Sequence, residues 1–192
     1  MTFEMKKIVA TVCLLISFAA IHAEAFKIHE NRASFGVGFG WTHKERISSS
    51  THFPAPNMLI ERSVLPFKDF GFISVGAQFG FHHGYHNATF PTRYKESWTN
   101  LFFIPRLALY FHEAFYEEGF PENIDLYAGV GIGFDYLSHK IPDHIGFPNG
   151  SGFKFGYNFF AGARYYFTSH ASVFLELGYG LSFLNTGIAI RY

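Results

Sequence analysis

The sequence predicts an all-β fold, an eight-stranded antiparallel up-and-down transmembrane β-barrel, and three observations lead to that prediction. Apolar side chains recur at every second position, as in Leu175, Leu177 and Tyr179, and this spacing is typical of a strand with one apolar face. The positions between them hold mostly Gly, Ala, Asn and isolated charges, which suit the inside of a narrow barrel. Charged residues make up only 16% of the chain, whereas a soluble domain usually holds about 25%.

The second face of the strands distinguishes this barrel from the alternative, a soluble sandwich or lipocalin-like barrel. A sheet surface that meets water is expected to carry Lys, Glu and Thr, whereas a row of exposed glycines would weaken the strands. We therefore expect lipid to contact the apolar face and small side chains to line the lumen. The 26 Phe and 19 Gly residues favour β structure over helix.

The N-terminal segment has the features of an export signal. Two lysines precede an apolar run at residues 8–21, and the small residues Ala23 and Ala25 follow it, as in a secretory signal peptide. We expect residues 1–23 to be a cleaved signal peptide and residues 24–192 to be the barrel domain.

The charge balance and the cysteine content exclude two further features. Lys and Arg together number 15, as do Asp and Glu, so the chain lacks the basic surface that a nucleic-acid partner would need. Cys13 is the only cysteine and lies in the expected signal peptide, so the mature protein is expected to contain no disulfide.

The first four predicted strands lie in the N-terminal half of the chain. They span residues 33–41, 58–65, 73–81 and 100–112. The first, ASFGVGFGW, alternates aromatic residues and Val with Ser and Gly, and the third, ISVGAQFGF, repeats that pattern. The second, MLIERSVL, is weaker because Arg62 interrupts its apolar face. In the fourth, NLFFIPRLALYFH, Pro105 cannot donate to the ladder and predicts a β-bulge.

The last four predicted strands show the alternation more clearly. They span residues 126–136, 153–167 and 172–180, and then about residues 184–192. LYAGVGIGFDY alternates apolar residues with glycines and Asp135, and FKFGYNFFAGARYYF sets aromatic residues opposite Lys, Gly, Asn and Arg. SVFLELGYG and LNTGIAIRY have the same two faces.

The connections between these strands differ in length at the two ends of the predicted barrel. Long polar segments at 44–57, 84–95 and 138–152 alternate with shorter ones such as 66–71 and 168–171. An even strand count then places both chain ends beside the short turns. Aromatic residues are expected to form a girdle at each rim. One girdle would hold Trp41, Phe81, Trp98, Tyr136 and Phe155, and the other Phe111, Phe167 and Tyr192.

The segment GARYYFTSHASVFLELGYGLSFLNTGIAIRY resembles the last three strands of small OmpA/OmpX-type outer-membrane β-barrels of Gram-negative bacteria. This resemblance implies a location in the cell outer membrane and contact with outer-membrane lipid. It also implies that the outer-membrane assembly machinery recognises the final strand, which ends in Tyr192.

Charged residues on the inward face predict an ion-pair network in the lumen. Glu61, Arg106, Arg164 and Glu176 face inward, with Lys154, Asp135 and Arg191 nearer the ends. Arg164 and Glu176 should lie diagonally across two neighbouring strands, and buried charges persist only when they are paired. We therefore expect a plugged lumen, as the resemblance also implies; a gate or narrow pore is the alternative. Inward-facing Phe102, Tyr110, Tyr127, Phe160 and Tyr166 favour the plug.

Histidines are the candidates for a metal site. His82, His83 and His86 could offer imidazoles to zinc or copper. However, the first two point to opposite faces of a strand, and no carboxylate partner is evident. We therefore expect polar loop residues, with no metal and no cofactor.

The expected function is that of a non-catalytic integral outer-membrane protein. Its barrel would be a scaffold, and its extracellular loops would serve envelope integrity or contact with an extracellular ligand or host surface. The alternatives are a small pore or channel for ions or small solutes, and an enzyme that modifies lipid A. Such an enzyme needs a His, Ser and acid constellation, whereas Ser169-His170 lies in a predicted short turn with no acid beside it.

Overall fold

The computed structural model describes residues 29–40, 50–67, 70–88, 94–111, 121–141, 150–180 and 182–192. The expected signal peptide of residues 1–23, including Cys13, lies outside the described residues, as does Trp41. Within the described ranges, no helix is long and apolar enough to cross a membrane.

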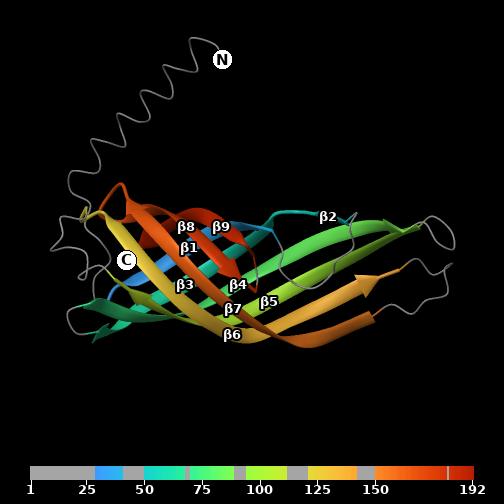
Figure 1. Ribbon diagram of the computed structural model, residues 1–192, viewed down its shortest axis with the longest axis horizontal. Helices are drawn as coiled ribbons and strands as arrows, with labels where there is room; N and C mark the ends of the chain where they lie inside the picture. Colours follow the sequence, from blue (N-terminus) through green and yellow to red (C-terminus); the bar gives the residue numbers. More distant parts are fainter. Residues whose placement is uncertain are drawn as a thin grey trace, which may run out of the picture.

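A closed antiparallel ring is the main feature of the structure (Figure 1). The strands are β1 (Asn31–Phe39), β2 (Ser50–His52), β3 (Ala55–Phe67), β4 (Gly71–Ala88), β5 (Tyr94–Tyr110), β6 (Ile124–Lys140), β7 (Gly150–Tyr166), β8 (Ala171–Tyr179) and β9 (Leu184–Arg191). In the described part of the chain, eight strands pair with their sequence neighbours, and β1 with β9 closes the ring, while short β2 pairs with β4 alone. The predicted eight-stranded up-and-down barrel is therefore confirmed.

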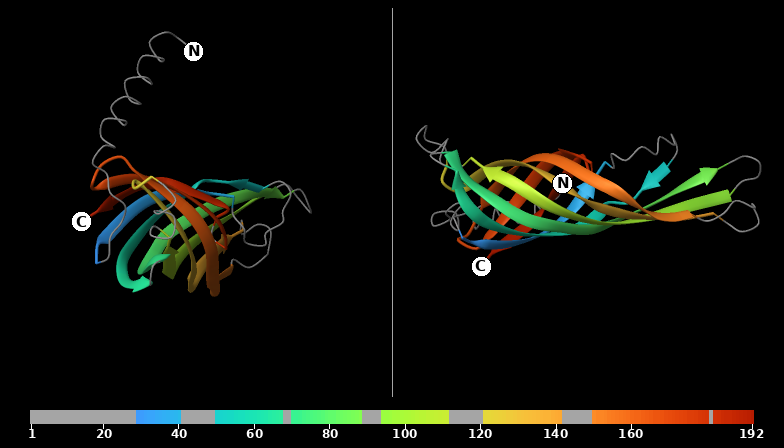
Figure 2. Two further views of the ribbon diagram at one scale, coloured as in Figure 1. Left: turned by 60° about the vertical axis from the view of Figure 1, so that its left-hand side comes forward. Right: turned by 90° about the horizontal axis from the view of Figure 1, so that it is seen from below.

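Four strands are much longer than the others and form one extended wall. β4 has 18 residues and β5, β6 and β7 have 17 each, whereas β1 and β8 have 9 and β9 has 8. A membrane-crossing strand needs only about 9–11 residues. The extra residues carry β4–β7 well past the short strands at the end away from the C-terminus (Figures 1 and 2). We call this the long-strand end, and the opposite end, which holds Asn31 and Tyr192, the terminal end.

The long-strand end corrects the predicted loops. Residues 84–95 were expected to be a loop, but β4 continues to Ala88 and β5 begins at Tyr94, which pairs with Ala88. Parts of the other two predicted loops are also strands: β2 and the start of β3 lie within residues 44–57, and β6 reaches Lys140. A backbone ladder needs no apolar side chains, so strands continue where the alternation fades.

The β-bulge expected at Pro105 is wrong. Pro105 opposes Ala77, and the β4–β5 register is unbroken there. On its other side, Ile104 and Pro105 have no partners in the β5–β6 ladder, so the proline, which lacks an N–H group, interrupts no register. The register shift lies instead in β3, between Ser63 and Leu65.

The girdle position predicted for Trp98 is also wrong. Its side chain is only 3% exposed and lies against Gly84, where an added Cβ would meet the indole. Trp98 shares the inward face of β5 with Asn100 and Phe102, because side chains two residues apart point the same way.

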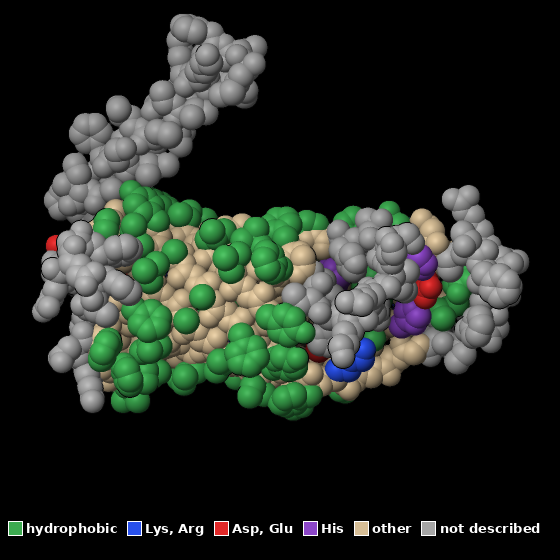
Figure 3. All heavy atoms as spheres, in the orientation of Figure 1, with side chains coloured by type: hydrophobic (Ala, Val, Ile, Leu, Met, Phe, Trp, Pro, Cys, Tyr) green, Lys and Arg blue, Asp and Glu red, His purple; other side chains and the backbone are tan. Residues whose placement is uncertain are grey.

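The distribution of side chains is inverted relative to a soluble protein. Many large apolar residues are exposed on the outside of the strands, including Phe35, Val75, Leu101, Ile132, Phe155, Leu175 and Ile188. In Figure 3, hydrophobic side chains spread along the barrel, while most charged and histidine side chains in view gather toward the long-strand end. The buried interior, by contrast, contains arginines and carboxylates.

Candidate functional site

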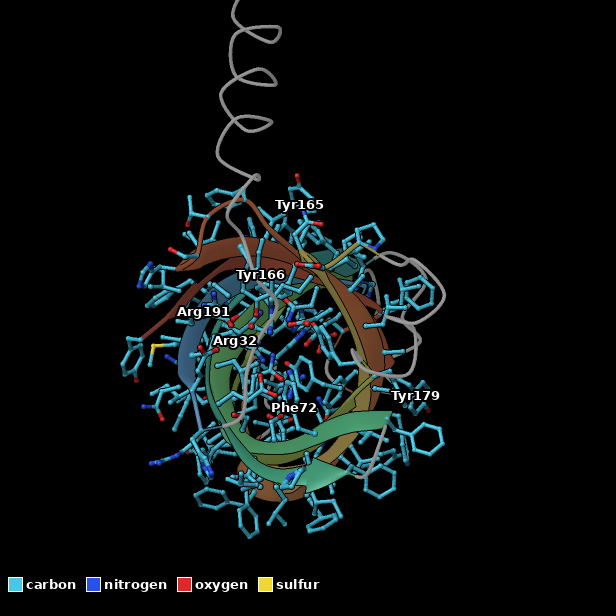
Figure 4. All side chains as sticks on the ribbon, turned by 90° about the vertical axis from the view of Figure 1, so that its left-hand side faces the viewer. Arg32, Phe72, Tyr165, Tyr166, Tyr179 and Arg191 are labelled. Atoms are coloured by element: carbon cyan, nitrogen blue, oxygen red, sulfur yellow. The ribbon has the colours of Figure 1, made fainter. Side chains whose placement is uncertain are left out.

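The barrel interior is the candidate site because alternate residues of every strand converge there. Viewed from the terminal end in Figure 4, Arg32, Phe72 and Tyr166 point into the ring, while Tyr165 and Tyr179 point away from it. The buried polar residues include Arg32, Glu61, Ser74, Gln78, Asn100, Arg106, Asp125, Asp135, Asn158, Arg164, Glu176 and Asn185. Many of them, together with Asn57 and several tyrosines, form two hydrogen-bonded groups.

A bidentate ion pair between Arg106 on β5 and Glu176 on β8 spans the lumen. Arg106 Nη2 lies 2.7 Å from Glu176 Oε1, and Arg106 Nη1 donates to Glu176 Oε2 at 3.3 Å. The two side chains are only 2% and 5% exposed. Charges this deeply buried require a partner of opposite sign, and the planar guanidinium satisfies both carboxylate oxygens at once.

Three amide side chains close this pair into a loop of hydrogen bonds. Arg106 Nη1 donates to Gln78 Oε1 (3.2 Å), and Gln78 Nε2 donates to Asn57 Oδ1 (3.1 Å). Asn57 Nδ2 then donates to Asn185 Oδ1 (2.9 Å), and Asn185 Nδ2 donates to Glu176 Oε2 (3.3 Å). We call these residues of β3, β4, β5, β8 and β9 the Arg106 circuit. The circuit ties opposite walls of the barrel together.

The second group surrounds Arg32, nearer the terminal end. Arg32 Nη2 lies 2.5 Å from Glu61 Oε2, and Ser74 Oγ also donates to Glu61. Tyr110 OH donates to Glu61 Oε2 (3.1 Å) and accepts from both Arg32 and Arg164, the latter at 3.0 Å. The Arg32 cluster comprises these residues together with Tyr166, whose hydroxyl accepts from Arg32 Nη1 at 3.1 Å.

Aromatic rings fill the space between the two groups. The rings of Tyr110 and Tyr127 stack at 4.9 Å with an interplanar angle of 23°, and Tyr127 OH donates to Glu176 Oε1 at 3.2 Å. The Arg106 guanidinium lies 3.6 Å from the centre of the Phe160 ring, in cation–π geometry. The aromatic residues expected in the lumen, Phe102, Tyr110, Tyr127, Phe160 and Tyr166, are all buried.

The structure places Glu61, Arg106, Arg164 and Glu176 in the interior, but their partners differ from the predicted ones. Arg164 was expected to pair with Glu176. The β7–β8 register sets Gly162 opposite Glu176 and Phe174 opposite Arg164, so the two charged residues do lie on the predicted diagonal. The Glu176 carboxylate nevertheless binds Arg106, and Arg164 Nη1 donates to Tyr110 OH. An added Cβ at Gly162 would meet the Tyr127 ring, so an aromatic ring occupies the position next to Glu176.

Several interior residues escaped the sequence prediction. Arg32 lies just before the predicted first strand; extending that strand by one residue would place Arg32 on the inward face with Ser34. Asn57 falls within residues 44–57, which the sequence predicts to be a loop. Of the end residues, Asp135 is buried as expected, whereas Lys154 is exposed. Arg191 donates to Glu30 Oε2 at 3.3 Å.

The candidate metal ligands do not converge. His82 is buried on the inward face of β4, whereas the outward His83 contacts Thr99 Oγ1 through Nδ1 at 2.9 Å. His86 opposes Glu96 on β5. Among the described residues, no group of three His, Cys, Asp or Glu side chains could hold a metal ion. Ser169 and His170 lie in the exposed β7–β8 turn, where Ser169 Oγ is 2.7 Å from His170 Nδ1.

The open space beside the Arg106 circuit is small. A cavity of about 20 Å³ is lined by residues that include Gln78, Asn158, Glu176 and Asn185. Such a volume holds roughly one water molecule.

Comparisons with known proteins gave similarity at the level of structure alone. No family model matches the sequence, and no curated protein matches it. The chain is similar to the N-terminal β-barrel domain of OprF from Pseudomonas aeruginosa, with 12% identity over 87% of this chain and 100% of that one (TM-score 0.47). Neisserial surface protein A (NspA) shows 9% identity over 84% of this chain and 93% of that one (TM-score 0.46). Ail of Yersinia pestis, solved with the heparin analogue sucrose octasulfate, shows 12% identity over 85% and 99% of the two chains (TM-score 0.44).

Proposed function

We propose that this chain is a non-catalytic integral protein of the bacterial outer membrane, with a plugged barrel that carries the long-strand end as a contact surface. The observation that supports it is the inverted distribution: exposed Phe, Leu, Ile and Val outside, ion pairs inside. In water, an apolar surface around the whole barrel would far exceed the few hundred Å² that soluble proteins expose. Hydrocarbon is the solvent in which such a surface is stable.

The plug is supported by the two interior groups and the rings between them. The Arg106 circuit and the Arg32 cluster span the lumen at successive levels, and Tyr110 stacked on Tyr127 connects them. Opening a pore would break charge-assisted bonds and leave the charges without partners. A rigid scaffold therefore fits this interior better than a channel does.

The contact surface is supported by the shape and chemistry of the long-strand end. Here β4–β7 extend beyond the length that a membrane requires (Figure 2). Polar contacts are found there on both faces of the wall. On the inward face His139 Nε2 lies 3.0 Å from Glu96 Oε2, and on the outward face Lys95 Nζ lies 3.9 Å from the Tyr85 ring centre. We propose that this end meets an extracellular ligand or host surface, and that the terminal end faces the periplasm.

Two measurements test these proposals separately. Heat-modifiable migration on a detergent gel, after refolding into lipid vesicles, reports insertion; a chain that binds no vesicles would contradict the membrane location. Planar-bilayer recordings then test the plug. The wild-type protein is expected to be silent, whereas the double variant Arg106→Ala/Glu176→Ala should open transient conductance. Equal, steady conductance of both proteins would favour the channel and contradict the plug.

A further inference from the structure

One charged residue lies on the outer, apolar surface of the barrel. Among the described strand residues, the outward-facing charges are those of Arg62, Lys95 and Lys140. The two lysines are at the tips of β5 and β6 at the long-strand end, where strands leave the membrane region. Arg62, in contrast, lies within β3 between the inward-facing Glu61 and Ser63.

The surroundings of Arg62 are apolar along its own strand and on the β4 side, where it opposes Val75, and polar on the β1 side. On β3, Ile60 is 41% exposed and Leu65 is 58% exposed, so the belt continues on both sides. Across the sheet, Arg62 opposes Asn31, and Asn31 is bonded through its backbone to Tyr192 (3.2 and 3.0 Å). A guanidinium, an amide and a phenol therefore lie in one row on the outer surface, which we call the Arg62 row.

The height of Arg62 sets what it can reach. Arg62 lies level with Asn31, where β1 begins, and with Tyr192, so it stands at the terminal rim of the β1–β9 side of the ring. A long Arg side chain can extend from the edge of the hydrocarbon to the headgroup layer. Within the part of the chain that the structure describes, no hydrogen bond or ion pair is found for the Arg62 side chain.

We propose that the Arg62 row binds the phosphate of an anionic phospholipid headgroup in the leaflet at the terminal end. The fork of N–H groups on Arg62 matches two phosphate oxygens, and Asn31 and Tyr192 supply further donors to the headgroup. A charge on the lipid-facing surface is costly near mid-membrane and inexpensive at the interface, so an interfacial anion stabilises Arg62 where it stands. This site rests on the proposed membrane location.

The test compares Arg62→Gln with the wild type after refolding into vesicles of phosphatidylcholine and phosphatidylglycerol. Lys95→Gln is the matched control, because it removes an outward charge at the opposite end. After gentle extraction into detergent, native mass spectrometry counts the phosphatidylglycerol molecules retained by each barrel. We expect Arg62→Gln to bind this lipid about tenfold more weakly, from the loss of charge-assisted hydrogen bonds, and Lys95→Gln to match the wild type.

Further arms separate the possible outcomes. Arg62→Lys keeps the charge without the fork and should retain an intermediate amount of lipid. Inorganic phosphate added at millimolar concentration should not displace the lipid if the headgroup is held together with its acyl chains. Equal lipid retention by inserted wild type and inserted Arg62→Gln would overturn the site and leave the membrane location intact. A wild-type barrel that fails to insert would overturn both.

Discussion

At the scale of single residues, Tyr110 connects the interior charges. Its hydroxyl accepts from Arg32 and Arg164 and donates to Glu61, so one oxygen contacts both guanidinium groups and the carboxylate. The ring is fully buried and stacks on Tyr127. A phenol provides both the flat ring and the hydroxyl that this position uses, and phenylalanine would provide only the ring.

Replacing Tyr110 with Phe should therefore destabilise the barrel. Arg164 Nη1 and the Glu61 carboxylate each lose a partner in the dry interior, and an unsatisfied buried polar group costs about 1–3 kcal/mol. The measurement is the free energy of unfolding in urea from lipid vesicles. The control is Tyr165→Phe on the outer face (Figure 4), and equal stability of the two variants would contradict the role given to Tyr110.

A double-mutant cycle should separate the Arg106–Glu176 pair from its surroundings. Removing either partner alone leaves a buried charge uncompensated, with an expected loss of about 3–5 kcal/mol. The double variant Arg106→Met/Glu176→Met removes both charges and keeps apolar volume, so it should regain most of that loss. The unfolding free energies of the four proteins give the coupling. Losses that simply add in the double variant would show that the two groups act independently.

At the scale of strands, the sequence predicted the membrane-crossing segments better than their extensions. Inside the belt, one face meets lipid and the other the lumen, so the two-residue period is strong, as in β7. Beyond the belt both faces meet polar surroundings, and the period fades although the ladder from Ala88 and Tyr94 onward is continuous. The two-residue period predicted which side chains face the interior. It did not predict that Arg106 pairs with Glu176, because β5 and β8 are not neighbours in the ring.

The long-strand end should loosen independently of the barrel when Gly84 acquires a side chain. Gly84→Val would push its Cβ into the Trp98 indole, so the buried Trp98 should become exposed and its fluorescence emission should shift to longer wavelength. The chain has 2 Trp residues, so the experiment uses a Trp41→Phe background. The matched control is Gly150→Val, whose added Cβ meets no atom within 4 Å. A red shift in the control alone would contradict the packing described for Trp98.

At the scale of the whole molecule, the interactions that stabilise the barrel and the surface that we propose for extracellular contact lie in different parts of the structure. The Arg106 circuit, the Arg32 cluster and the ring closure between β1 and β9 all lie within the length shared by every strand of the ring. The extended wall of β4–β7 adds surface beyond that shared length (Figure 2). Charged residues of the strands lie mainly inside the barrel, so the outer surface carries few ionic groups. The polar side chains that we propose for contact are at the long-strand end.

Shortening the β4–β5 hairpin should therefore abolish the proposed attachment to an extracellular surface and leave the barrel folded. His83 and Thr99 are direct cross-strand partners, so residues 84–98 can be replaced by Asn-Gly, a two-residue connection that suits an antiparallel pair. We expect the shortened protein to insert into vesicles, to keep heat-modifiable migration, and to unfold within about 1 kcal/mol of the wild type, because the variant leaves both interior groups intact. Cells that display it should lose attachment to coated surfaces that the full protein supports. A shortened protein that no longer inserts would show that the wall contributes to barrel stability, and undiminished attachment would remove the wall from the contact surface.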